Sequence, residues 1–245
     1  MKIPPARGVR TGAVLAVASA AVLAVGGCQS GGGKDDSAGS KASSAPTAAA
    51  GTKALNGSTL KTLLLPASAM PKGFHLSPDG SRDTGDGHMQ VANSPVPAAK
   101  ACEVLGQTSW IRVANLNGAA FAQNDYADAS QTQQVAQEID TYKGDGARQV
   151  MAKLRKVFAH CATFTDRSGG TPVKVRLRTV ILHGVGDEGL KAVETSPTWQ
   201  GGMTLAAVRV GDAVVTTLYS SIHADKGAAA VTMAAKIAKK VQAAS

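Results

Sequence analysis

One cysteine near the N-terminus carries the clearest chemistry in the chain. Cys28 follows Val25-Gly26-Gly27, so its thiol stands beside small residues that an enzyme can approach closely. Small residues before a cysteine, at the end of an apolar segment, are typical of a bacterial lipobox. There a diacylglyceryl group is transferred to the sulfur, and the chain is cut before the cysteine. The pattern therefore predicts lipidation of Cys28.

The segment before Cys28 has the order of charges that a secretory signal needs. Three cations lie within the first ten residues, and residues 11–27 then run without a charge. This run is short for a spanning helix, which takes about 20 apolar residues. Residues 1–27 are therefore predicted to be a lipoprotein signal peptide, with an ordinary signal peptide or an uncleaved anchor as the alternative. Two or three acyl chains on Cys28 would hold the protein on the extracytoplasmic face of the cell membrane.

Composition divides the rest of the chain into a tether and a domain. Residues 28–56 are rich in Gly, Ser, Ala and Thr and lack apolar periodicity, which predicts a lipidated N-terminus followed by a disordered tether. Residues 57–245 are long enough for a single extracytoplasmic domain with its own core.

The charge balance argues against a nucleic-acid partner. The net charge of +9 includes +3 from the leader, which leaves 9 − 3 = +6 after cleavage, and aromatic residues make up 4% of the chain. Such mild basicity with so few aromatics does not form a base-stacking platform. A basic exterior suits a surface of anionic lipids or wall polymers, and it equally serves plain solubility.

Two cysteines remain once Cys28 is set aside. An even pair outside the cytoplasm predicts a disulfide between Cys102 and Cys161, with two buried free thiols as the alternative. Such a bridge closes a loop of about 60 residues and stabilises the fold by about 4 kcal/mol on the chain-entropy model.

Hydrophobic periodicity predicts the elements that must position these residues. Helices are expected over residues 58–65, 98–105, 145–161 and 225–243, with Ser58 as the cap of the first, and strands over 119–128, 171–182, 203–210 and 213–222. Residues 130–142 are ambiguous and favour a helix, and residues 77–93 are rich in Gly, Asp and Ser and predict a loop.

This order of elements predicts an α+β fold. Gly211-Asp212 is a favoured two-residue hairpin turn, and helices lie between and after the strands. We expect an antiparallel β-sheet with helices packed mainly on one face.

Three local patterns resemble functional motifs and are explained more simply. Residues 184–189 match G-x-G-x-x-G, but Asp187 and Glu188 would oppose phosphate charge. Residues 58–61 match S-x-x-K without the partner motifs S-D-N and K-T-G. The acidic residues between 79 and 88 match no calcium-loop spacing. We therefore expect no metal, no cofactor and no enzymatic activity.

One strand face offers the strongest exposed candidate for ligand binding. Lys174, Arg176 and Arg178 alternate with apolar residues, so three cations share one side of a strand. They could meet a phosphate, a carboxylate or an anionic lipid. An ordinary solvated strand face is the alternative.

Several segments, taken in order, resemble secreted actinobacterial lipoproteins and the PknH-like extracellular sensor domain. They are residues 63–66, 71–74, 124–128, 160–164 and 185–188, followed by the final β-hairpin and helix. The resemblance implies an antiparallel sheet with flanking helices and a cleft proposed to bind an unidentified ligand. The kinase member of that family is similar in using paired disulfides, whereas this chain has one cysteine pair after Cys28. No binding residue of the family is carried over.

Three hypotheses for function follow. The first is a lipid-anchored, extracytoplasmic ligand-binding or sensor-like module that binds a small molecule, a lipid or a wall component and is not an enzyme. The second is a lipid or glycolipid carrier with an enclosed apolar cavity. The third is an envelope-acting enzyme whose site is assembled from distant residues.

Overall fold

A computed structural model describes residues 55–90, 96, 98–167, 170–223 and 227–245. The predicted signal peptide, Cys28 and most of the tether lie outside the described residues. Among the residues described, no helix combines the length and hydropathy needed to cross a membrane.

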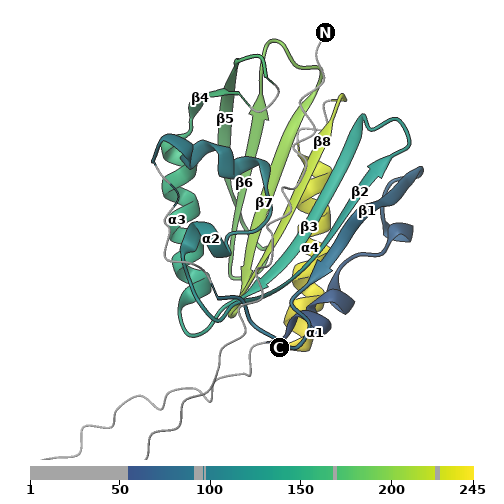
Figure 1. The fold of residues 1–245 in the computed structure, drawn as a ribbon, viewed down its shortest axis with the longest axis vertical. Coiled ribbons are helices and arrows are strands. Elements are labelled where there is room, and N and C mark those ends of the chain that lie inside the picture. The colour runs from purple at the N-terminus through teal and green to yellow at the C-terminus, as the bar shows by residue number, and fades with distance from the viewer. Residues whose placement is uncertain (1–54, 91–95, 97, 168–169, 224–226) are drawn as a thin grey trace, which may run out of the picture. The chain divides into compact units, whose positions relative to one another are not determined.

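An eight-stranded sheet forms the centre of the molecule, and every pair of neighbouring strands is antiparallel (Figure 1). Its order is β1-β2-β3-β8-β7-β6-β5-β4. The strands are β1 (Phe74–Asp83), β2 (Ala120–Asp128), β3 (Gln133–Thr141), β4 (Thr163–Asp166), β5 (Val173–Leu182), β6 (Glu188–Thr195), β7 (Gly202–Val210) and β8 (Ala213–Ser221). The α+β class and the antiparallel sheet predicted from the sequence are confirmed.

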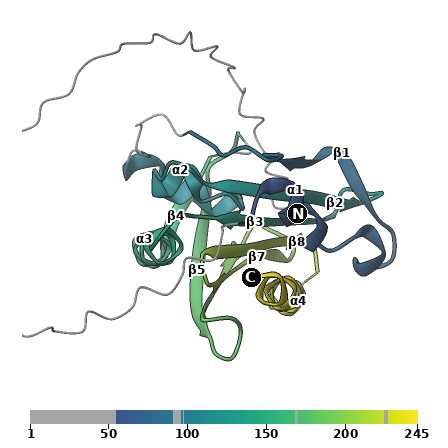
Figure 2. The same ribbon diagram turned by 90° about the horizontal axis from the view of Figure 1, so that it is seen from below.

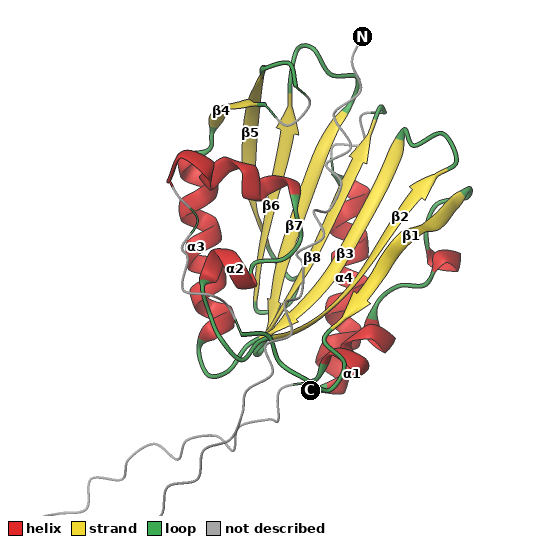
Figure 3. Ribbon diagram, viewed as in Figure 1, coloured by secondary structure: helices red, strands yellow, loops and turns green. Residues whose placement is uncertain are grey.

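The helices are short except for two. They are α1 (Gly57–Leu63), α2 (Ile111–Ala114), α3 (Gly146–His160) and α4 (Ala228–Ala244), with 3-10 segments η1 (Ala67–Ala69) and η2 (Ala98–Gly106). Figure 3 shows how α3 and α4 run alongside the strands. Both carry the apolar stripe that the sequence predicted, and Val150, Leu154 and Ile237 are buried.

The helices divide between the two faces of the sheet, rather than packing mainly on one as predicted. α1 and α4 cover one core, and η2, α2 and α3 cover the other (Figure 2). The reason lies in the central strands, which are apolar on both sides. Ala206 and Val215 belong to the core under α4, whereas Ala207 and Val214 belong to the core under α3. A sheet that is apolar on both faces must bury each of them, so helices pack on both sides.

The expected loop over residues 77–93 is wrong in its first half, where β1 extends to Asp83. Its register with β2 shifts between Leu76 and Ser81, around Pro78 and Asp79. A bulge on an edge strand tolerates residues that a central strand excludes. The Gly- and Asp-rich composition therefore marks an irregular strand edge.

The helix favoured over residues 130–142 is also wrong, because this segment is β3. Val135 and Ile139 are spaced like neighbours on a helix, and Gln137 lies between them on the same strand face. Gln137 is buried and exchanges hydrogen bonds with the main chain of Leu65, at 3.0 Å and 2.6 Å. Because Gln137 is polar although it occupies a core position, the sequence does not show the alternation of apolar and polar residues that predicts a strand.

The first helix is capped by Asn56 instead of Ser58. The Asn56 Oδ1 accepts a hydrogen bond from the Thr59 backbone N–H at 2.9 Å. Asn56 also donates from Nδ2 to Asp86 at 2.8 Å, so the cap is fixed from a second side.

Candidate functional site

The disulfide predicted from the cysteine count is present. Cys102 in η2 and Cys161 at the C-cap of α3 are joined with an S–S distance of 2.11 Å, across 59 residues of sequence. The bridge fastens residues 98–114, which we call the strap, to the end of α3.

The strap contacts the sheet through hydrogen bonds to buried side chains. The Thr108 Oγ1 donates to Glu138 Oε2 at 2.7 Å, and the Trp110 backbone N–H donates to Asp140 Oδ2 at 3.1 Å. The Trp110 Nε1 donates to the Thr216 Oγ1 at 2.7 Å. Together with the disulfide, these bonds hold the strap over β3 and β8.

Glu138 and Asp140 form a buried pair of carboxyls under the strap. They lie two residues apart on β3, so both side chains point to the same face of the sheet, and each residue is 1% exposed. Burial raises the pKa of Glu138 well above its usual value, and the neighbouring Asp140 charge raises it further. Burial also raises the pKa of Asp140 to about 6, against hydrogen bonds from Glu138, Trp110 and Tyr142 that lower it.

The pair therefore holds a proton more tightly than ordinary carboxyls do, and Glu138 is the member that retains it. Groups with such pKa values are capable of proton transfer. In this structure, however, both lie out of contact with solvent, so a substrate would have to displace the strap to reach them.

Polar side chains extend this cluster across the sheet toward solvent. In the strand register, Arg82, Gln123, Glu138 and Thr216 stand in one row over β1, β2, β3 and β8. Arg82 Nη2 donates to Gln123 Oε1 at 3.1 Å, and Gln123 Nε2 donates to Asp125 Oδ1 at 2.8 Å. Burial raises the pKa of Asp125 against the hydrogen bond from Gln123 and the Arg82 charge, which lower it. The row leads from half-exposed Arg82 to the closed carboxyl pair.

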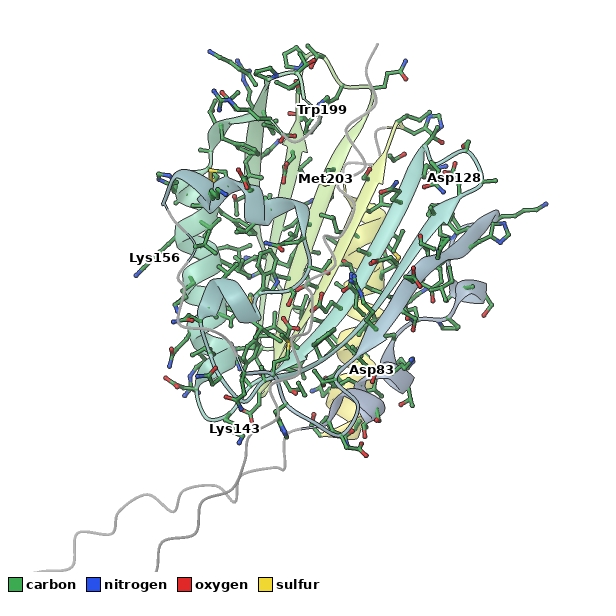
Figure 4. The ribbon with its side chains drawn as sticks, viewed as in Figure 1. Asp83, Asp128, Lys143, Lys156, Trp199 and Met203 are labelled. Carbon is green, nitrogen blue, oxygen red and sulfur yellow. A yellow bond between two sulfur atoms is a disulfide. The ribbon has the colours of Figure 1, made fainter. Side chains whose placement is uncertain are left out.

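A separate, open depression of about 800 Å³ lies at one end of the sheet. Its lining includes Pro172, Val173, Trp199, Gln200, Ile222 and His223, from the connections where β5 and β7 begin and β6 and β8 end. Trp199 stands at this end of the molecule, and Lys143 at the opposite end (Figure 4). An indole with apolar neighbours can hold a planar or aliphatic group, and the imidazole and amide can orient it.

The predicted cations lie on β5, whose first residue, Val173, lines this depression. Lys174 directly follows Val173 in β5, and Lys174, Arg176 and Arg178 are all exposed. In the described part of the chain, none of the three side chains has an ion pair or a hydrogen bond. Leu177, which alternates with them, faces the core under α3, so the cations share the face that carries α4.

The acidic residues of the neighbouring strands do not neutralise that face. Asp166 of β4 is in register with Val173, and Glu194 of β6 is in register with Leu177. Paired residues point to the same side of a sheet, so both carboxyls lie on the opposite face from the cations. The structure thus places three unpaired positive charges on one surface.

The motif-like segments have structural roles. In the stretch 184–189, the Asp187 carboxylate accepts hydrogen bonds from Arg209 Nη1 at 2.9 Å and from the Gly211 N–H at 2.8 Å, which ties the β5–β6 connection to the β7–β8 turn. Asp83 pairs with Lys61 Nζ at 2.9 Å, and this hydrogen bond lowers the pKa of Asp83. Over the residues described, no three His, Cys, Asp or Glu side chains gather as a metal site.

Sequence reasoning missed the buried carboxyl pair. The signal was the spacing of Glu138 and Asp140, which places both on one face of a strand but on different faces of a helix. Once this segment was taken as a helix, the two carboxyls could not be brought together.

No protein-family model matches the chain, and no curated protein matches it. Among solved structures, the extracellular domain of PknH from Mycobacterium tuberculosis aligns over 79% of this chain and 100% of its own, with a TM-score of 0.59 and 16% identity. The chain has the fold of that extracellular domain. The resemblance predicted from the sequence is thereby confirmed at the level of fold. An uncharacterized protein from Mycobacterium smegmatis aligns over 71% of this chain and 92% of its own, with a TM-score of 0.40 and 10% identity.

Proposed function

We propose that the chain is a lipid-anchored, extracytoplasmic ligand-binding or sensor-like module, and that it is not an enzyme. The observation that carries this proposal is the fold shared with the whole of the PknH extracellular domain. A fold alone does not specify function, which depends on the residues of the site.

The depression and the neighbouring cations support a ligand with two chemical parts. Trp199 and Ile222 offer apolar contact in the depression, and Lys174, the residue after Val173, offers positive charge on the other face of the same strand end. A lipid, a wall fragment or a small molecule with an anionic group and an apolar or planar part fits this combination.

The location of the unusual acids supports binding over catalysis. The carboxyls whose pKa values are raised by burial, Glu138 and Asp140, lie under the strap and away from the depression's lining. The depression itself is open. An open depression suits a ligand that binds and dissociates reversibly, whereas a lipid carrier needs an enclosed cavity.

The proposed anchor sets how far the domain extends from the membrane. Residues 29–54 lie between Cys28 and Leu55, the first residue that packs on the domain, and a Gly- and Ser-rich chain of this length would span about 30 Å on average. That reach keeps the domain near the bilayer and leaves it free to meet wall components.

Native mass spectrometry would test the binding role. The Cys28→Ser chain, exported to an oxidising compartment, would be measured as purified and after addition of an envelope extract of lipids and wall fragments. We expect an adduct that Trp199→Ala and Lys174→Ala weaken and that Lys143→Ala, at the opposite end, leaves unchanged (Figure 4). A tightly co-purified lipid unaffected by Trp199→Ala would favour a carrier, conversion of the ligand would favour an enzyme, and no adduct would contradict the proposal.

A further inference from the structure

The outer edge of β5 is open along half its length. β4 pairs with β5 over Val173–Arg176, and the Leu177 N–H donates to the Ala162 carbonyl at 3.0 Å. From residue 178 to residue 182, β5 pairs with β6 on one side, and no strand of the described chain lies on the other.

This open edge carries unused backbone hydrogen-bonding groups. The N–H groups of an antiparallel strand point alternately to its two sides, and that of Leu177 points toward β4. Those of Thr179 and Ile181 therefore point outward, as do their carbonyls. In the described part of the chain, no hydrogen bond engages them. An edge of this kind is a template for another strand.

The side chains along the edge are unusually apolar for a surface. Val180 is 37% exposed and Ile181 is 61% exposed, and these are two of the three large hydrophobic residues exposed in the described chain. The third is Leu76, on β1 at the opposite edge of the sheet. There the bulge around Pro78 and Asp79 interrupts the edge, whereas β5 continues in regular register to Leu182.

Charge decides what kind of strand would fit. A strand added beside residues 178–182 would place alternate side chains next to Arg178 and Val180 on one face, and next to Thr179 and Ile181 on the other. The unpaired Arg178 guanidinium favours an acidic residue on the first face, and the exposed Ile181 favours an apolar residue on the second.

We propose that the β5 edge binds an extended segment of a partner protein in which acidic and apolar residues alternate, by adding it to the sheet as a ninth strand. This mode of peptide recognition takes its affinity from the backbone and its specificity from alternate side chains. The surface is separate from the ligand depression, and the proposal does not rest on the proposed function.

A second copy of this chain fits the edge less well. Pairing two β5 edges antiparallel would put the cations of both copies on the same face of the joined sheet. A contact over residues 178–182 alone would also fall below the roughly 1,000 Å² that a stable interface buries.

Fluorescence anisotropy with a labelled Val-Glu-Val-Glu-Val-Glu peptide would test the proposal, using the full exported chain with Cys28→Ser. We expect saturable binding that weakens as salt rises. Thr179→Pro removes an outward N–H without touching the ladder to β6, and it should weaken binding at least tenfold. Arg178→Glu should weaken it by a similar factor, whereas Lys156→Glu, an exposed charge change on α3, should have little effect.

Thermal unfolding and a thiol count would show that Thr179→Pro keeps the fold and the disulfide, and Ile181→Lys provides a second variant at an exposed position. The proposal would be overturned if the peptide still bound to Thr179→Pro and Ile181→Lys as it does to the unsubstituted edge. It would also be overturned if the peptide did not bind to the unsubstituted edge. A concentration-dependent dimer in sedimentation, abolished by Thr179→Pro, would assign the edge to a second copy instead.

Discussion

Replacing Asp140 by asparagine should stabilise the protein at neutral pH and leave it little changed in acid. Asp140 is fully buried, and its pKa rises from 3.8 to about 6 on folding, chiefly through desolvation. A difference of about 2 units corresponds to about 3 kcal/mol, at 1.36 kcal/mol per unit. This is the approximate cost of ionising Asp140 in the folded protein.

The sign of the effect follows from proton counting. Below pH 3.8 the Asp140 carboxyl is protonated in both states, so it imposes no cost. Between pH 3.8 and about 6 the unfolded chain has released the proton and the folded chain still binds it, so the free energy of unfolding falls as pH rises. Above about 6 the full cost is present. The gain from Asp140→Asn should therefore grow through this window and level off near 3 kcal/mol.

Urea unfolding of the wild type, Asp140→Asn and Asp79→Asn between pH 4 and pH 8 would measure this difference. The asparagine oxygen can still accept from the Trp110 N–H and the Tyr142 hydroxyl, which donate to Asp140 at 3.1 Å and 3.0 Å. Asp79→Asn removes an exposed carboxyl at a left-handed position that asparagine tolerates, so it controls for charge alone. Two results would refute the reasoning. One is that Asp140→Asn raises the free energy of unfolding by an amount that does not vary with pH. The other is that it lowers the free energy of unfolding as much at pH 7.5 as at pH 4.

Three further substitutions have defined expectations. Replacing Cys102 and Cys161 together by alanine should lower the free energy of unfolding by about 4 kcal/mol, since the bridge closes a loop of 59 residues, and reduction of the wild type should match it in urea unfolding. Asn56→Ala should cost about 1 kcal/mol while Ser58→Ala costs little, because the cap bond comes from Asn56; equal losses would contradict this assignment. Cys28→Ser should move the protein from the membrane fraction to the soluble fraction and abolish labelling by radioactive palmitate; retention in the membrane would argue for an uncleaved anchor.

Much of the fold was predictable because many elements obey simple periodicity. The helix α3 has its apolar stripe, β5 alternates from Val173 to Leu177, and Gly211-Asp212 turns the β7–β8 hairpin, with Gly211 at a φ of 55°. The disulfide was predictable from the parity of the cysteines. In each case local chemistry and the final fold agree.

The missed elements are those in which tertiary contacts override the local pattern. β3 buries Gln137, Glu138 and Asp140, and each has a hydrogen-bond partner far along the sequence, such as Leu65 or Thr108. One oxygen of each carboxyl, Glu138 Oε1 and Asp140 Oδ1, is buried without a hydrogen-bond partner among the described residues. Polar residues in core positions carry no apolar period to detect. The depression was equally invisible, since it is assembled from the connections at one end of the sheet, and distances between loops are set by the fold.

The position of β8 has a consequence for how the chain acquires its structure. β8 lies between β3 and β7, and its partners in β3 are about 80 residues away along the chain. During synthesis the meander β1-β2-β3 can form early, but β3 keeps an unpaired side until β8 is complete. Pairing between such distant strands is slow, because the intervening chain loses the entropy of loop closure before the contacts between β3 and β8 can form. The nascent protein should therefore be most exposed to aggregation and proteolysis in the interval before β8 has been completed.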